Sequence, residues 1–371
     1  MRITAAVTES RGAPFVLREV ELGELRSDEI LVRVAAAGIC HTDLICRDQW
    51  YPVPLPAVLG HEGAGVVEAV GPAVTKVVPG DRVGMTFSSC GSCTTCLRGQ
   101  QAYCHQFFEH NFASSRPADG SSVLGDIHAH FFGQSSFATH AVAGERNVVK
   151  LSSRIRLEVA APFGCGIQTG AGAVLNSLAA PAGSSLAVFG TGTVGLAAVL
   201  AAGVAGCAPI VAVDINPARR ALALELGATH AVDPGTEDAV EAVRRITAGG
   251  ADFSLEATGI PAVLRSCVDC LAPTGVCGVI GAPAFGTEVS LDVNTLLTGG
   301  RVVRGIVEGD SVPDEFLPRL VELWEQGRFP VERLMTFYDF DQIEQAAHDA
   351  ETGQTIKAVL RMASADERSE E

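Results

Sequence analysis

One segment restricts the possible folds of this chain more than any other: residues 185–206, SLAVFGTGTVGLAAVLAAGVAG, followed by VAVD at 211–214. It is long and apolar enough to resemble a membrane helix, which needs roughly 20 apolar residues. Its three early glycines disfavour one continuous helix. The apolar runs before and after them instead predict a buried strand, a crossover helix and a second buried strand. We therefore reject a membrane span here.

The glycines in this segment have the spacing G-x-G-x-x-G and are Gly190, Gly192 and Gly195. After a strand, the first permits a tight turn, the second lets the backbone approach a pyrophosphate, and the third lets the helix pack on the strand. Asp214 closes the next strand, where a carboxylate accepts hydrogen bonds from a ribose 2'-hydroxyl and repels a 2'-phosphate. The pattern thus predicts NAD rather than NADP. NADP stays possible, because either Arg219 or Arg220 can bind a phosphate.

Helix-like and strand-like segments continue to alternate after Asp214, ending in the strand GVCGVIG. This alternation predicts a doubly wound parallel sheet over residues 167–307. Cys267 and Cys270 form a CxxC within it, and without a second pair nearby they are expected to be small buried residues.

The sequence before residue 167 consists of short β-branched segments punctuated by glycine and proline, which predicts a mainly β domain over 1–166. At 371 residues, the chain exceeds what one core usually serves. Residues 308–371 are expected to return to the first domain with a helix, a strand and a helix ended by Gly353. The charged end, ASADERSEE at 363–371, is expected to be frayed.

Four cysteines with spacers of two, two and seven residues are Cys90, Cys93, Cys96 and Cys104. Such a set can surround a tetrahedral zinc ion completely, which is typical of a structural site. Two disulfides or a zinc-ribbon nucleic-acid module are the alternatives. The start MRITAAVTESRG lacks a signal sequence, which predicts a reducing cytoplasmic location. The net charge of -16 disfavours nucleic acid and membrane surfaces as partners.

Three further motifs are GICHTD at 38–43, GHEGAGVVEAVG at 60–71 and FGCGIQTGAG at 163–172. With the cysteine segment and the glycine turn, they make the chain resemble the zinc-dependent medium-chain alcohol dehydrogenases along nearly its whole length. The resemblance implies an α/β protein with a mainly β, GroES-like catalytic domain and a Rossmann domain. Within that family, GICHTD, FGQSSF, GCGIQTGAG and RGIVEGDS are similar to the aryl-alcohol branch, which includes benzyl alcohol and geraniol dehydrogenases.

The resemblance also implies a set of functional residues. The expected ligands of a catalytic zinc ion are Cys40, His61 and Cys165. The expected catalytic residues beside them are His41, Thr42, Asp43 and Glu62, of which Asp43 orients the imidazole and Thr42 accepts the alcohol proton. The expected NAD-binding residues are His41, Thr169, Gly190, Gly192, Thr193, Val194, Gly195, Asp214, Arg219 and Lys357. Where many relatives have a proton-relaying histidine, this chain has Ile45, so we expect His41 and the cofactor ribose to complete the relay.

The resemblance therefore implies an NAD-linked enzyme with two zinc ions per subunit, which transfers hydride from a zinc-bound alkoxide. The family branch implies primary aryl or allylic alcohols and their aldehydes as substrates. A thiol-dependent formaldehyde dehydrogenase shares CHTD and is the nearest alternative, although the stretch after it offers only Arg47 for an anionic adduct. A zinc-bearing binding protein without turnover is the alternative from another class. The resemblance implies a homodimer or homotetramer, and the phenylalanines of segment 107–137 are candidates for substrate walls, a subunit contact or core packing.

Overall fold

The computed structural model describes residues 1–362, so the predicted frayed end at 363–371 lies outside the described residues. The chain forms two compact units. The first unit contains residues Met1–Cys165, Val312–Gln326 and 331–362, and the second contains Gly166–Ser311 and Gly327–Pro330. The compact units thus change at 165/166 and 311/312, whereas the predicted domain limits were 166/167 and 307/308.

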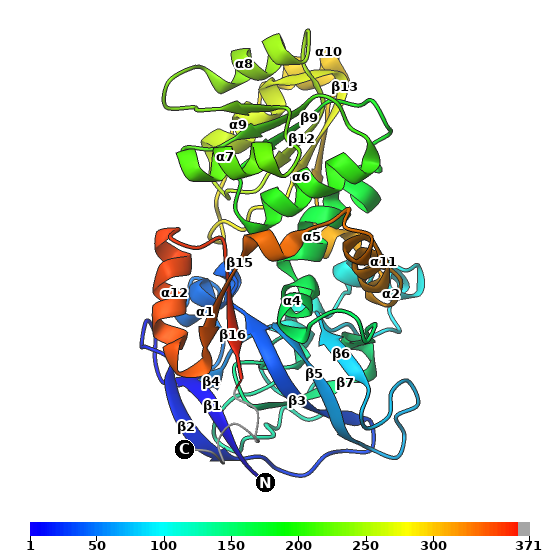
Figure 1. The fold of residues 1–371 in the computed structure, drawn as a ribbon, viewed down its shortest axis with the longest axis vertical. Coiled ribbons are helices and arrows are strands. Elements are labelled where there is room, and N and C mark those ends of the chain that lie inside the picture. The colour runs from blue at the N-terminus through cyan, green and yellow to red at the C-terminus, as the bar shows by residue number, and fades with distance from the viewer. Residues whose placement is uncertain (363–371) are drawn as a thin grey trace. The chain divides into compact units, whose positions relative to one another are not determined.

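The second unit is built on a six-stranded parallel sheet, drawn in green to yellow in Figure 1. The strand order is β11-β10-β9-β12-β13-β14, which is the order of dinucleotide-binding sheets. The strands are β9 (Leu186–Phe189), β10 (Ile210–Val213), β11 (His230–Val232), β12 (Ala251–Glu256), β13 (Leu271–Val279) and β14 (Val302–Gly305). The helices are α5 (Gly166–Gly172), α6 (Thr193–Ala205), α7 (Pro217–Glu225), α8 (Ala239–Ile246), α9 (Pro261–Asp269) and α10 (Val293–Gly299). The predicted doubly wound fold is confirmed.

The apolar segment 185–206 forms β9, a glycine turn and α6, so its strand-turn-helix interpretation is confirmed. Among the described residues, no helix is both long enough and apolar enough to cross a bilayer. Cys267 and Cys270 are fully buried in the core of this unit, in agreement with their predicted packing role.

The first unit is mainly β. Its larger sheet has the order β15-β16-β3-β5-β6-β8, with β7 also paired to β3, and its smaller sheet has the order β2-β1-β4. The strands are β1 (Arg2–Thr8), β2 (Val16–Glu21), β3 (Glu29–Gly38), β4 (Ala57–Val58), β5 (Glu62–Val70), β6 (Arg82–Met85), β7 (His140–Gly144), β8 (Val148–Lys150), β15 (Met335–Asp339) and β16 (Lys357–Arg361). The helices are α1 (His41–Arg47), α2 (Thr94–Leu97), α3 (Phe107–Asn111), α4 (Leu157–Ala160), α11 (Pro313–Glu325) and α12 (Ile343–Thr352).

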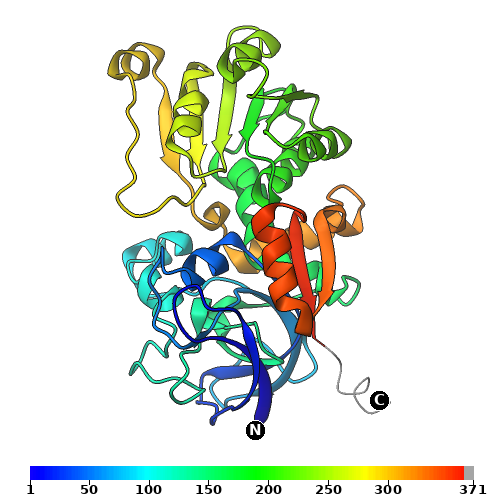
Figure 2. The same cartoon turned by 90° about the vertical axis from the view of Figure 1, so that its left-hand side faces the viewer.

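The C-terminal segment completes the sheet of this unit. Strand β16, red in Figures 1 and 2, runs antiparallel beside the blue strand β3, with Val359 opposite Gly38. On the other side of β3, Gly38 also lies opposite Glu62, the first residue of β5. Three segments that are far apart in sequence therefore bring their ends to one place in the sheet.

Candidate metal centre and nucleotide-binding turn

The ends of β3 and β5 and a short 3-10 helix, η4 (Ala161–Gly164), bring the predicted zinc ligands together. Cys40 follows β3, His61 precedes β5, and Cys165 follows η4. One ligand atom from each of these residues and from Glu62 lies within 4.8 Å of the others. A zinc ion with Zn–S bonds of about 2.3 Å and Zn–N bonds of about 2.0 Å fits a cluster of this size.

His61 is fully buried, and its two ring nitrogens have different surroundings. Nδ1 lies 2.8 Å from a carboxylate oxygen of Asp43. Within residues 1–362, the buried Nε2 makes no hydrogen bond, and the His61 ring lies in the same cluster as the cysteine sulfurs. Because a buried polar atom without a partner is costly, this nitrogen is suited to bind a metal ion.

The electrostatics of the cluster also suit a cation. Hydrogen bonding to Cys165 is the main reason that the pKa of Cys40 is lowered well below that of an ordinary thiol. Burial lowers the pKa of His61, but the Asp43 carboxylate and the Cys40 sulfur outweigh burial and raise it. A thiolate beside an imidazole that holds a proton is an arrangement in which a metal ion can replace that proton.

Asp43 organises the cluster through both of its carboxylate oxygens. Besides the contact with His61, Oδ1 accepts a hydrogen bond from the Gly60 amide at 3.1 Å, and Oδ2 accepts one from the Cys40 amide at 2.9 Å. The side chain is fully buried in α1. The residue predicted to orient the imidazole therefore also fixes the backbone of Cys40 and of Gly60, the residue before His61.

Cys165 is positioned by a close approach of backbone. The Thr86 hydroxyl donates to the Gly164 carbonyl at 2.7 Å. A Cβ atom at Gly164 would lie only 2.0 Å from the Met85 carbonyl oxygen, so glycine is required before the cysteine.

A strained loop packs on the other side of His61, and the sequence analysis did not identify its role. Its residues His130, Phe132 and Ser135 all have left-handed backbone, with φ of 90°, 51° and 50°. The Phe132 ring stacks on the His61 ring with 4.4 Å between centroids. Backbone strain of this kind persists only where surrounding contacts hold it. The quoted motif FGQSSF covers residues 132–137, most of this loop, and was the available sequence signal.

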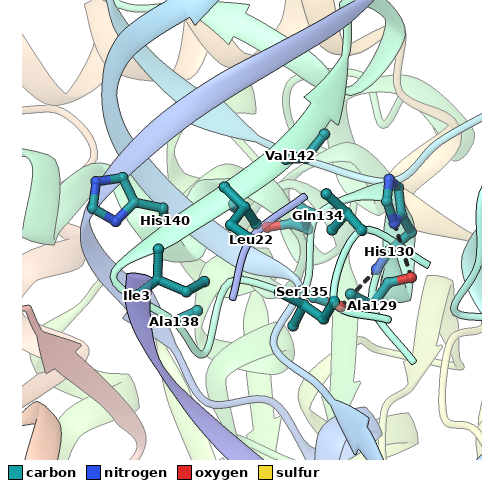
Figure 3. A pocket seen from close by; sticks show the side chains of 12 residues that line it. Ile3, Leu22, Ala129, His130, Gln134, Ser135, Ala138, His140 and Val142 are labelled. Carbon is teal, nitrogen blue, oxygen red and sulfur yellow. Dashed lines mark hydrogen bonds between the residues drawn. The ribbon is translucent and has the colours of Figure 1, made fainter. Parts of the chain in front are cut away.

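Two buried polar side chains hold this loop, and Figure 3 shows both beside a small pocket. The Ser135 hydroxyl accepts from the His130 and Phe131 amides, each at 2.9 Å, and donates to the Val58 carbonyl. Gln134 accepts from the Gly63 amide at 3.0 Å and donates to the His61 carbonyl at 2.9 Å. The loop is thus bonded to the backbone on both sides of His61. Phe107, Phe112 and Phe131 extend the aromatic packing around it.

Glu62 and Lys357 form an ion pair beside the cluster. The Lys357 ammonium donates to both Glu62 oxygens, at 3.0 and 2.8 Å, and to the Ile39 carbonyl at 2.9 Å. Both side chains are buried, which excludes the interpretation of either as an ordinary surface charge. Since the two oxygens of one carboxylate can share a single N–H of the ammonium, the contacts with Glu62 and Ile39 leave one donor. The cofactor contact predicted for Lys357 stays a prediction.

The residues predicted to carry the proton lie in the first turn of α1. Thr42 is half-buried, and its hydroxyl oxygen is 3.7 Å from the Cys40 sulfur. His41 is exposed, whereas Ile45 is buried. The His41 imidazole therefore has access to solvent, whereas position 45 offers no group that can carry a proton.

The four cysteines of the second cluster also converge. The sulfur atoms of Cys90, Cys93, Cys96 and Cys104 all lie within 4.8 Å of one another. All eleven cysteines of the chain are described and none forms a disulfide. The geometry fits a closed four-thiolate zinc site and disfavours the disulfide alternative.

The glycine turn lies in the second unit. Gly190 has φ of 90°, and a Cβ at Gly195 would lie 1.9 Å from the Gly190 carbonyl oxygen. A Cβ at Gly192, by contrast, would meet no atom of the described chain within 4 Å. Thr193 and Val194 begin α6 directly after it. Gly190 thus has the left-handed backbone of a tight turn, Gly192 is open to a ligand, and Gly195 packs closely on the turn, as the motif predicts. They lie at the N-terminus of a 13-residue helix.

Asp214 closes β10 and is held in place by backbone. One of its oxygens accepts from the Thr191 amide and hydroxyl at 2.6 and 2.8 Å, and the other accepts from the Asn216 amide at 2.8 Å. Arg220 is engaged by Asp233 at 2.8 Å. Among the described residues no carboxylate pairs with Arg219, whose Nε is buried without a hydrogen bond.

Thr169, the remaining predicted cofactor residue, is on α5. It is buried, and its hydroxyl donates to Glu308 at 3.3 Å. The structure therefore places it in a polar contact within the second unit.

Comparison with known proteins identifies the family. The model of the alcohol dehydrogenase GroES-like domain matches residues 26–153, and that of the zinc-binding dehydrogenases matches residues 193–325. Geraniol dehydrogenase from Castellaniella defragrans is 48% identical over 361 residues, which cover 96% of each chain.

Two solved structures are similar over their full length. Benzyl alcohol dehydrogenase from Acinetobacter calcoaceticus matches with a TM-score of 0.96 and 48% identity, covering 98% of this chain and 100% of that chain. An alcohol dehydrogenase zinc-binding domain protein from Burkholderia ambifaria matches with a TM-score of 0.95, 55% identity and the same coverage.

Proposed function

This chain belongs to the zinc-dependent medium-chain alcohol dehydrogenases, and from this premise we propose that it interconverts primary aryl or allylic alcohols and their aldehydes with NAD. Zinc and a nicotinamide dinucleotide are the cofactors of such an enzyme. Benzyl alcohol and geraniol are the proposed model substrates, because the names of two relatives include them.

One observation carries this proposal: the buried His61 Nε2 has no hydrogen-bond partner among the described residues and clusters with two cysteine sulfurs. Cys40, His61 and Cys165 would hold a zinc ion with a fourth position open, as catalytic zinc sites require. Cys90, Cys93, Cys96 and Cys104 would hold a second, structural ion. When bound, the zinc ion acts as a Lewis acid on the alcohol oxygen, and the nicotinamide accepts the hydride.

The protein's own residues prepare this chemistry. Asp43 accepts the Nδ1 proton of His61, which fixes the tautomer and leaves Nε2 to face the metal. Thr42 is proposed to accept the alcohol proton through its hydroxyl. The exposed His41 is proposed to pass that proton to solvent, since the side chain of Ile45 has no titratable group.

The second unit is proposed to bind NAD at the Gly190 turn, with the ribose hydroxyls at Asp214. The carboxylate would repel a 2'-phosphate, and Arg220 already pairs with Asp233. Of the two arginines after β10, Arg219 is the one that could still bind a 2'-phosphate and so favour NADP. A direct comparison of the two cofactors therefore belongs in the test.

The test is to purify the chain, measure zinc per subunit, and follow absorbance of the reduced cofactor with benzyl alcohol, geraniol, ethanol and a formaldehyde-thiol adduct. We expect two zinc ions, turnover of benzyl alcohol and geraniol, and faster turnover with NAD than with NADP. Preference for the thiol adduct would favour the formaldehyde dehydrogenase alternative. Bound zinc without turnover of any alcohol would favour the binding protein.

A further inference from the structure

The carboxylate of Glu62 lies close enough to the candidate zinc ligands to become a ligand itself. One of its oxygens is within 4.8 Å of the ligand atoms of Cys40, His61 and Cys165. Carboxylate oxygens bind zinc at about 2.0–2.2 Å, and four protein ligands make a closed site of the structural kind. A catalytic site needs an open position, so something must keep this oxygen away from the metal.

The sheet places a cation where it can do this. Strands β16, β3 and β5 are adjacent, which brings Lys357 beside Glu62. A Cβ at Gly38, between them on β3, would lie 2.1 Å from Glu62 Oε2. Glycine at position 38 therefore leaves the space that the carboxylate occupies in its contact with Lys357.

The contact engages both carboxylate oxygens. Lys357 Nζ lies 3.0 Å from Oε1 and 2.8 Å from Oε2. The Glu62 side chain is 0% exposed and that of Lys357 is 2% exposed, so water cannot replace either partner. Moving the carboxylate to the metal would leave the buried ammonium with the Ile39 carbonyl as its hydrogen-bond partner, and the loss of a directly paired charge in a buried site is unfavourable.

We propose that Lys357 is a positioning residue that holds Glu62 out of the zinc coordination sphere and thereby keeps the fourth position open for the alcohol. This inference rests on the proposed zinc site. It gives Lys357 a role at the metal centre that is separate from the predicted contact with the cofactor pyrophosphate.

The test uses the full chain loaded with Co²⁺, without dinucleotide or alcohol, and imidazole as a ligand for the open position. Imidazole binding is followed by the change that it causes in the cobalt absorption spectrum. A closed four-thiolate site has no position for imidazole, so its absorption does not change. In Lys357→Met we expect Glu62 to compete for the position and weaken imidazole binding by about ten-fold or more. Adding Glu62→Gln to that variant removes the competitor and should restore binding to within about three-fold of the parent.

Two controls complete the design. Lys150→Met removes an exposed lysine from the same sheet and should leave imidazole binding unchanged. Glu62→Gln alone should also change it by less than about three-fold, because a carboxylate held by Lys357 does not compete. If Lys357→Met fails to fold, Glu62→Gln alone still tests the proposal, because imidazole binding that becomes ten-fold tighter would show that Lys357 does not hold the carboxylate away from the metal.

Parental affinity in a folded Lys357→Met would overturn the inference, as would ten-fold tighter imidazole binding in Glu62→Gln. The proposed function fails separately. If the cobalt spectrum of the parent does not change with imidazole, or does not depend on Cys165, the zinc assignment falls and this inference falls with it.

Discussion

Asp43 orients several groups of the candidate zinc site at once, because its two oxygens accept hydrogen bonds from His61, Gly60 and Cys40. An asparagine in its place has one oxygen and one NH₂ group, so it cannot accept from both the imidazole and the Cys40 amide. The orientation of two candidate ligands therefore depends on the carboxylate.

We expect Asp43→Asn to lower the affinity of one of the two zinc ions by about 10- to 100-fold, the range typical for lost partners of metal-binding histidines. The measurement is zinc competition with a chelator, with circular dichroism as a check on the fold. Asp48→Asn, a change of a half-buried aspartate that pairs with Arg47, is the matched control and should retain both ions. Parental affinity in Asp43→Asn would show that His61 is oriented by other contacts.

At the scale of elements, the strained loop at 130–136 depends on Gln134. Its amide joins the Gly63 N–H and the carbonyls of His61 and Thr86, all buried. Replacing it with a methionine of similar length removes its hydrogen bonds to the Gly63 amide and the His61 carbonyl, and each buried group that loses its bond costs about 1–3 kcal/mol.

Gln134→Met is therefore expected to lower the free energy of unfolding by about 2–6 kcal/mol and to weaken zinc binding at His61. Urea unfolding and zinc content measure the two effects. Gln326→Met, at an exposed position after α11, is the control and should be close to neutral. A stable variant with full zinc content would mean that the loop does not position His61.

The start of β3 is joined to the segment after α3 by a second buried contact. Arg116 binds both oxygens of Glu29, at 2.6 and 2.7 Å. Burial alone would raise the pKa of Glu29, but the His130 imidazole, 3.7 Å away, and the hydrogen bonds from Arg116 outweigh burial and lower the pKa from 4.5 to about 2.

A carboxyl group whose pKa is lower in the folded state stabilises the protein above its unfolded pKa and loses this effect as pH falls through the folded value. Glu29→Gln should thus reduce the free energy of unfolding at pH 7 by up to about 3 kcal/mol. The difference in free energy of unfolding between Glu29→Gln and the parent should become smaller as pH falls from 4.5 towards 2. Urea midpoints across this range test it, with the exposed Glu19→Gln as control. A gap independent of pH would exclude an ionic contribution.

For the whole molecule, the two cysteine clusters are expected to separate stability from chemistry. A structural ion contributes folding free energy, whereas a catalytic ion mainly supplies reactivity. Cys104→Ser and Cys165→Ser should each reduce zinc from two ions to one per chain.

Their other effects should differ. We expect Cys104→Ser to lower the Tm by about 5–10 °C, which corresponds to a loss of a few kcal/mol. Cys165→Ser should abolish turnover with a smaller change in Tm. Differential scanning calorimetry, zinc analysis and activity with benzyl alcohol distinguish them. Equal losses of Tm and activity in both variants would contradict the division of roles.

The glycine turn and its flanking strands could be predicted from sequence because their determinants are local. Gly190, Gly192 and Gly195 are separated by few residues, and strand and helix periodicity places them without knowledge of distant contacts. Likewise, the short spacers between Cys90 and Cys104 restrict the four sulfurs to one small volume. The family resemblance supplied the trio Cys40, His61 and Cys165, which spacing alone does not identify.

Other features were decided only by tertiary structure. Phe132 contacts His61 because the chain accepts left-handed backbone at a loop, and no periodic pattern encodes such strain. Lys357 reaches Glu62 only because the C-terminal strand β16 returns to pair with β3. Contacts between residues hundreds of positions apart depend on sheet order and on burial, which removes water as a competing partner. The sequence by itself determined the glycine turn and the four-cysteine segment. The order of strands in the sheet determined that Lys357 lies beside Glu62 and the candidate zinc ligands.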